Sequence, residues 1–209
     1  MSYKLLIKKL MIDKKKIITR EELKEYCKNF KMSYSSVIGY LLRNRYAERI
    51  LRGIFYLKSI EERKLNKSDM SFYEAIKEAL RIKGVKNWYF GLESAIKLNN
   101  LTHEYFAIDF IISDKIKRKN TIEILGHKVK FLTIKKELIK FGIEKGKIPY
   151  SDIEKTILDI VYLGIYRGYS ESTIRNDIID YIDLCDKAKL INYAKHYPKT
   201  ILKFIPKTK

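Results

Sequence analysis

The sequence is poor in proline, glycine and cysteine. Its 209 residues include three prolines and nine glycines, too few for a proline-rich linker or a glycine-rich low-complexity segment. Hydrophobic residues make up 46% of the chain, which is enough to bury a core and argues against wholesale disorder. Cys27 and Cys185 each lie in a helical pattern among apolar residues. We therefore expect two small core side chains rather than a disulfide or a metal pair.

Long apolar runs and catalytic patterns are also missing. No run approaches the length of a membrane span, and the opening stretch MSYKLLIKKLMIDKKK has too many lysines for a signal sequence. The three histidines, His103, His127 and His196, are scattered, and the glycines form no phosphate-binding loop. We expect a cytoplasmic protein with no membrane partner, catalytic residue, metal or cofactor.

Negative charge is scarce as well. The chain has 44 Lys and Arg against 25 Asp and Glu, which gives a formal net charge of +19. The excess is concentrated at the front, because residues 1–60 hold 15 basic and 5 acidic side chains. So strong a bias favours a polyanionic partner, most often nucleic acid.

The first sixty residues contain an ordered set of helix and turn signals. Apolar residues between Tyr3 and Met11 follow helical spacing, and a second helix opens with a capping box between Thr19 and Glu22. Ser33 is a good N-cap for a third helix, and two apolar runs around Arg52-Gly53 predict a tight hairpin. Three helices followed by a hairpin are typical of a winged helix-turn-helix.

In such a module the third helix presents its exposed face to the DNA major groove. Here Tyr34, Val37, Ile38, Leu41 and Leu42 form the apolar arc, and the other arc is small, polar or basic. Serines can donate to phosphate, glycine permits close approach, and arginine and asparagine suit base edges. The predicted DNA-binding residues are Ser33, Ser35, Ser36, Gly39, Tyr40, Arg43 and Asn44, with Arg49 and Arg52 at the hairpin. The alternatives are an ordinary solvated helix face and a winged helix that contacts only protein.

The rest of the chain mixes helices and strands without a repeated βαβ rhythm, which predicts an α+β class. We expect a winged helix-turn-helix domain at 1–60, a linker at 61–70 and a mixed α+β domain at 71–209. A hairpin is predicted near Gly126-His127, and a helix capped by Ser151 follows. Asp177, Asp180 and Asp183 recur at steps of three. This pattern indicates either a solvated helix face or an acidic patch for a basic partner.

The order of these elements resembles the AbiEi family of antitoxins. After the winged-helix pattern come WYFGLESAIKLNNLT (88–102), YFAIDFIISD (105–114), IEILGHKVKFLTI (122–134) and YSDIEKTILDIV (150–161). The resemblance extends from about residue 3 to about residue 165 and leaves the tail after residue 186 unmatched.

The resemblance implies an abortive-infection, type IV toxin–antitoxin system. It implies that the N-terminal module represses its own operon by binding promoter repeats in double-stranded DNA. It also implies that the C-terminal domain neutralises a nucleotidyltransferase-like toxin and that the chain has no catalytic residues. Two alternatives stay open: a winged-helix transcription factor whose C-terminal domain senses an effector, and a nucleic-acid-processing enzyme.

Overall fold

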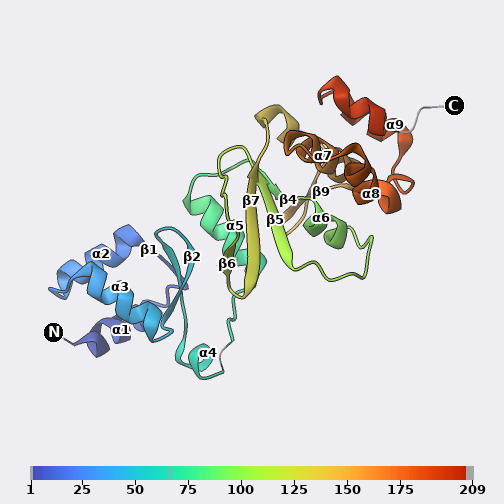
Figure 1. Cartoon of the computed structure of the whole chain (residues 1–209). Helices are drawn as coiled ribbons and strands as arrows, with labels where there is room; N and C mark the ends of the chain where they lie inside the picture. Colours follow the sequence, from blue (N-terminus) through green and yellow to red (C-terminus); the bar gives the residue numbers. More distant parts are fainter. Residues whose placement is uncertain (1, 66, 206–209) are drawn as a thin grey trace. The chain divides into compact units, whose positions relative to one another are not determined.

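The computed structural model describes residues 2–65 and 67–205, which form a mixed α+β fold in two compact units (Figure 1). The first unit contains the chain up to Lys83 together with Glu123–Gly126, and the second contains the remainder. The predicted α+β class is confirmed at this level. Each unit is described separately below.

The first unit packs three helices against a small antiparallel sheet with the strand order β1-β3-β2. Its leading elements are α1 (Tyr3–Ile12), β1 (Ile17–Thr19), α2 (Arg20–Asn29), α3 (Tyr34–Arg43), β2 (Ala47–Leu51) and β3 (Ile54–Leu57). The buried stripe of each helix and one face of the hairpin make a common apolar core. That core includes Leu6, Leu23, Cys27, Val37, Leu41 and Phe55.

Local sequence signals account for most of these boundaries. The Thr19 hydroxyl accepts from the Glu22 amide while the Glu22 carboxylate accepts from the Thr19 amide, so the predicted capping box is present. Gly53 turns the hairpin with a φ of 78°, a conformation that favours glycine. Strand β1 was not predicted, since three residues are too short to show alternation.

The segment 61–70, expected to be a linker, belongs to the first unit. Residues 60–65 form helix α4 (Ile60–Leu65), and α5 (Phe72–Ile82) follows within the first unit. Glu62 is buried and accepts hydrogen bonds from the Tyr56 hydroxyl and from the amides of Ser59 and Asp69. Because this buried carboxylate ties the segment to β3, the units divide near Lys83 and Gly84 rather than at 61–70.

The second unit is built around a sheet in which five strands follow the order β7-β5-β4-β9-β8. These strands are β4 (Trp88–Phe90), β5 (Ile108–Ser113), β7 (His127–Thr133), β8 (Ile143–Lys145) and β9 (Pro149–Ser151). Strands β5 and β7 pair in parallel, as do β4 and β9. The predicted turn near Gly126 is present, since Leu125 and Gly126 have φ values of 46° and 82° between β6 (Ile122–Ile124) and the start of β7.

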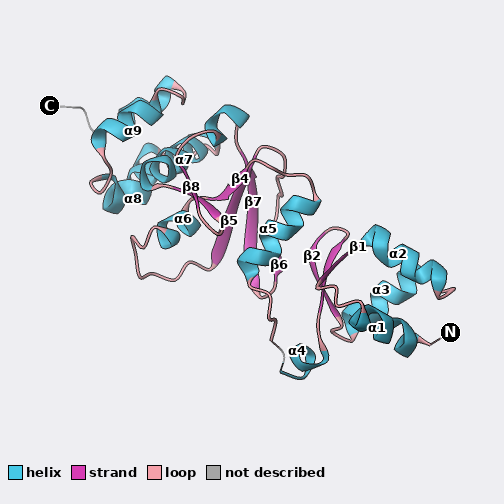
Figure 2. Ribbon diagram, turned by 180° about the vertical axis from the view of Figure 1, so that it is seen from behind, coloured by secondary structure: helices cyan, strands magenta, loops and turns pink. Residues whose placement is uncertain are grey.

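Four helices gather on the same side of this sheet in both ribbon views (Figure 2). They are α6 (Glu93–Leu98), α7 (Ile153–Tyr166), α8 (Glu171–Ile182) and α9 (Lys187–Ala194). Short 3-10 helices, η1 (Lys136–Ile139) and η2 (Lys199–Phe204), complete the unit. Helix α7 is capped by Asp152 and not by Ser151 as the sequence suggested, because the Asp152 carboxylate accepts from the Lys155 amide.

Substitution of Glu62 tests whether its buried carboxylate stabilises the first unit. We expect Glu62→Gln to lower its stability by about 2 kcal/mol, because hydrogen bonds to a buried charged group are lost or weakened. Burial opposes ionisation of Glu62, but the bonds from Tyr56, Ser59 and Asp69 outweigh it and hold its pKa below the ordinary value. A carboxyl group whose pKa is lowered by folding stabilises the fold above its unfolded pKa and loses this effect on acidification.

The measurement is urea unfolding of both proteins, monitored by hydrogen exchange of the amides in β3 and α4. The difference between wild type and Glu62→Gln should shrink as the pH falls below about 4, an ordinary carboxyl value. Glu61→Gln is the matched control, since Glu61 is exposed on the same helix. Equal stability losses in the two variants would contradict the role assigned to Glu62.

Candidate functional site

The outward face of α3 is small, polar and basic at its centre. Val37 and Leu41 point into the core, which leaves Ser35, Gly39 and Arg43 on the opposite side of the helix. Apart from its chain neighbours and the adjacent backbone of α3, no described atom lies within 4 Å of the position that a Cβ on Gly39 would occupy. Packing in the folded chain therefore does not require glycine there, and a partner can approach the backbone closely.

Within the described parts of the chain, the polar side chains of this face make hydrogen bonds only to nearby residues of the same segment. The hydroxyls of Ser33 and Ser35 are 2.8 Å apart. Arg43 Nε donates to the Gly39 carbonyl at 3.3 Å, and Asn44 Nδ2 donates to the Tyr40 carbonyl at 2.9 Å. All these bonds are exposed, so exchanging them for bonds to a partner has a small net free-energy change.

Tyr40 was predicted to lie on this outward face, and the structure places it elsewhere. Its ring stacks on Tyr3 of α1 with the centroids 4.2 Å apart, and Tyr46 lies 6.1 Å away on a nearly parallel plane. Tyr40 is half-buried against the core and packs α3 on α1. Tyr34 and Ile38, predicted within the buried arc, are instead half-buried and line a recess.

This recess of about 490 Å³ lies between α2, α3 and the β2–β3 hairpin. It brings together the predicted Arg49 and Arg52 with Arg20 and Lys83, against a single acidic residue, Glu21. The Arg20 guanidinium lies 5.5 Å from the Tyr34 ring centroid, and that of Arg49 lies 5.8 Å from Phe55. We call Arg20, Arg49, Arg52 and Lys83 the arginine recess.

Arg20 was not among the predicted DNA-binding residues, although its position in the sequence is informative. It is the first residue of α2, where the helix dipole disfavours a positive charge. The Arg20 amide donates to the Gly53 carbonyl at 2.8 Å, which attaches the start of α2 to the tip of the hairpin. A cation at the unfavourable end of a helix, fixed beside Arg49 and Arg52, suits an anionic partner.

The second unit has a buried ionic network at the start of α7. Lys155 and Asp159 are completely buried, and the Lys155 ammonium lies 3.0 and 3.1 Å from the two carboxylate oxygens. The Tyr89 and Tyr197 hydroxyls donate to the same carboxylate at 2.6 and 2.7 Å. Burial lowers the pKa of Lys155, and the Asp159 charge opposes that shift. These groups are closed to solvent and have a structural role.

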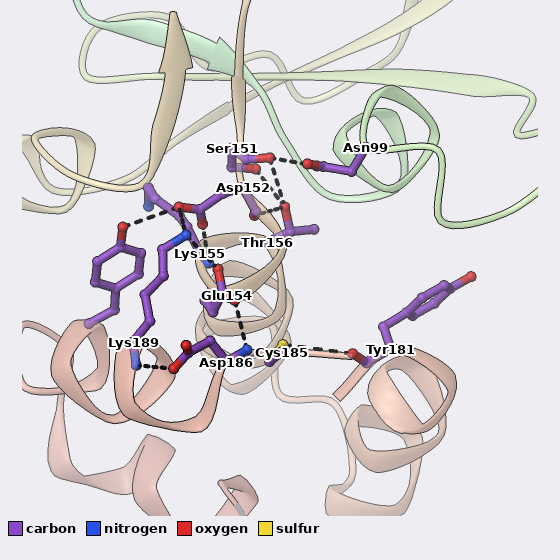
Figure 3. Close-up of polar contacts among 11 residues, drawn as sticks. Asn99, Ser151, Asp152, Glu154, Lys155, Thr156, Tyr181, Cys185, Asp186 and Lys189 are labelled. Carbon is purple, nitrogen blue, oxygen red and sulfur yellow. Dashed lines mark hydrogen bonds and ion pairs between the residues drawn. The ribbon is translucent and has the colours of Figure 1, made fainter. Parts of the chain in front are cut away.

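A more exposed cluster borders this network (Figure 3). Lys189 of α9 pairs with Asp152 at 3.1 Å and with Glu154 at 2.9 Å, and Glu154 also accepts from the Asp186 amide. The carboxylates that raise the pKa of Lys189 are therefore engaged by their own chain. Over residues 2–65 and 67–205, no group of three or more His, Cys, Asp or Glu side chains is arranged to hold a metal ion.

The acidic side chains at Asp177, Asp180 and Asp183 are exposed along α8. Helix α8 buries Ile174 and Ile178 on its other side. No ion pair or hydrogen bond of these three carboxylates is found among the described residues. Their geometry fits a solvated face and leaves them accessible to a partner.

Comparisons with known proteins bear on the fold alone. Neither a protein-family model nor a curated protein matches the chain. A crystal structure of the RV2827C protein from Mycobacterium tuberculosis is similar to it, with a TM-score of 0.59 and 12% sequence identity. The match covers 95% of this chain and 72% of that one. In the described parts of this chain, no helix is both long and apolar enough to cross a bilayer.

Proposed function

We propose that the chain binds double-stranded DNA through α3 and the arginine recess, and that it acts as a transcriptional autorepressor and antitoxin. The observation that carries the DNA-binding part is the arginine recess beside the open face of α3. The order of helices and strands in the first unit fits a winged helix-turn-helix, in which α3 is the recognition helix and β2–β3 the wing.

The two surfaces have different tasks in this proposal. Arg43 and Asn44 read base edges in the major groove, and Gly39 lets the helix approach closely. Ser33, Ser35 and Ser36 donate to phosphates near the helix start, where unpaired amides also attract anions. Arg20, Arg49 and Arg52 neutralise backbone phosphates and fix the register of the helix.

The toxin-neutralising part of the proposal rests on the resemblance to the AbiEi family. It assigns this task to the second unit, where the acidic face of α8 is exposed and unpaired among the described residues. A nucleotidyltransferase-like toxin that binds nucleic acid presents basic surface, and Asp177, Asp180 and Asp183 offer complementary charge.

Substitution of Gly39 distinguishes an effect on folding stability from an effect on DNA binding. We expect Gly39→Ala to stabilise the first unit by about 0.5–1 kcal/mol, because alanine is the better helix former and meets no described atom. The same change should weaken binding to the protein's preferred DNA, selected from a random pool, because the added methyl lies where the duplex approaches. Calorimetry and fluorescence anisotropy at fixed salt measure the two effects.

Arg43→Ala extends this test and should cost about 1–3 kcal/mol of DNA affinity while relaxing specificity at one base position. Lys28→Ala is the control, since Lys28 is an exposed basic residue in the last turn of α2. Unchanged affinity in both Gly39→Ala and Arg43→Ala would remove α3 from the interface.

The arginine recess should act on phosphates. We expect Arg20→Ala and Arg52→Ala to weaken selected and random DNA alike, and each to reduce the slope of log K against log salt by about one. Lys24→Ala, an exposed lysine elsewhere on α2, should leave the slope unchanged. A loss confined to the selected sequence would instead mean that these arginines read bases.

The antitoxin part is tested by growth rescue with the full chain. We expect co-expression to protect cells from a toxin encoded by the adjacent gene. Protection should fall in the triple variant Asp177→Asn, Asp180→Asn, Asp183→Asn, while DNA binding is retained. The matched control replaces three other exposed acids of the second unit, Glu104, Glu137 and Glu144, by glutamine. Rescue by the wild type that is undiminished in the triple Asp variant would exclude the α8 face.

A further inference from the structure

A second cationic recess lies in the second unit, far along the chain from α3. It has a volume of about 550 Å³ and is formed by the start of β4, the η1 helix and the loop that leads into β8. Four lysines line it: Lys86, Lys136, Lys140 and Lys145. We call it the Trp88 recess, after the aromatic side chain in its wall.

The charge of the Trp88 recess is of one sign. All four lysines are exposed, and no acidic residue lines the cavity. Among the described residues, none of the four makes an ion pair or a hydrogen bond through its ammonium group. Three other lysines of the unit, Lys155, Lys189 and Lys203, are paired with carboxylates. Four unpaired ammonium groups around one cavity attract an anion, with several contacts available.

The remaining wall is mostly apolar, with Asn87 as its polar side chain. Trp88 is half-buried, and its ring meets Phe90 edge-on with the centroids 5.7 Å apart. The other apolar side chains of the lining are Ile139, Phe141, Ile143 and Pro149. An aromatic ring bordered by cations is the arrangement on which a nucleobase stacks while its phosphates are neutralised. An inorganic anion would contact only the lysines and would leave the apolar surface exposed to water.

The shape of the Trp88 recess is fixed by the buried network behind it. Gly142 has a φ of 65°, and a Cβ there would lie 2.7 Å from Lys155 Cβ and 2.9 Å from Tyr193 Cε2. The Gly142 carbonyl accepts from the Asp152 amide at 2.9 Å. The Phe141 ring lies 5.1 Å from the Lys155 ammonium. The wall that faces a ligand is thus held in place before binding, which reduces the entropy lost on association.

We propose that the Trp88 recess binds a nucleotide, with its base stacked on Trp88 and its phosphates on the four lysines. The base must be unpaired, because the faces of bases in a double helix are already stacked. The ligand is therefore a free nucleotide or a nucleotide within a single strand of nucleic acid. This site is distinct from the double-stranded DNA surface proposed for the first unit and does not depend on it.

The chain offers a local reporter for this site, because Trp88 is its one tryptophan. We would titrate the full chain carrying Arg49→Glu and Arg52→Glu, which disables the proposed duplex-binding surface. The ligands are ATP, a twelve-residue oligothymidylate and inorganic triphosphate. We expect saturable quenching of Trp88 fluorescence by ATP, by the oligonucleotide or by both, and little quenching by triphosphate. Whichever of ATP and the oligonucleotide binds with the lower Kd shows whether the site takes a free nucleotide or a nucleotide within a single strand.

Two charge-matched variants test the lysines. We expect Lys136→Glu with Lys140→Glu to raise the Kd about tenfold or more at constant salt. The control variant, Lys97→Glu with Lys187→Glu, reverses the charge of two exposed lysines outside the recess. It should change the Kd less than about threefold. Trp88→Leu keeps apolar volume but removes the stacking surface. It should weaken a fluorescently labelled oligonucleotide or nucleotide about tenfold by anisotropy.

Three outcomes overturn the proposal. The first is the absence of quenching by both nucleotide ligands at concentrations up to the millimolar range. The second is an equal loss of affinity in the two double-lysine variants, which would show that only net charge matters. The third is triphosphate matching the nucleotides in both affinity and quenching, which would indicate an anion site without base recognition. Each result is independent of whether the first unit binds duplex DNA, because the arginine recess is disabled throughout.

Discussion

The second unit depends on one buried ammonium group. Lys155 has no contact with solvent, and a buried charge is tolerated only when it is paired and hydrogen-bonded. Asp159 supplies the opposite charge from the next turn of α7, while Tyr89 of β4 and Tyr197 beyond α9 donate to the same carboxylate. The central strand, the main helix and the C-terminal segment are thus positioned by the requirement to satisfy one ion pair. The wall of the Trp88 recess is attached to the same place through Phe141 and Gly142.

The first unit uses smaller, separate constraints. The Arg20 amide holds the start of α2 to the hairpin tip, and the Tyr3–Tyr40 stack holds α3 on α1. Glu62 satisfies three donors and joins α4 to β3. Each contact fixes one element of the first unit in place. Exposed side chains such as Arg43 and Ser35 can therefore vary without loss of the core, as expected for a rigid scaffold that presents variable contacts.

The sequence predicted what local periodicity and capping can encode. The Thr19–Glu22 capping box, the turn at Gly53 and the helix from 153 onwards follow from nearby residues, and all are present. Contacts set by tertiary packing were missed. Glu62 is polar in a polar stretch, so nothing local marks it as buried, and Tyr40 is drawn inward by a tyrosine 37 positions away. The parallel pairing of β5 with β7 passes over β6, which lies between them in the sequence, and the apolar patterns of the strands do not give a pairing direction.

The ion pair in the core of the second unit also bears on its response to heat. The hydration of charged groups carries a strongly negative entropy, so removing Lys155 and Asp159 from water becomes less unfavourable as the temperature rises. The attraction between the two groups and the hydrogen bonds from Tyr89 and Tyr197 remain inside the fold. Replacing the pair with apolar side chains of similar volume would remove this gain and would leave the Tyr89 and Tyr197 hydroxyls without their acceptor. The contribution of the buried pair to the stability of the second unit therefore becomes more favourable on warming.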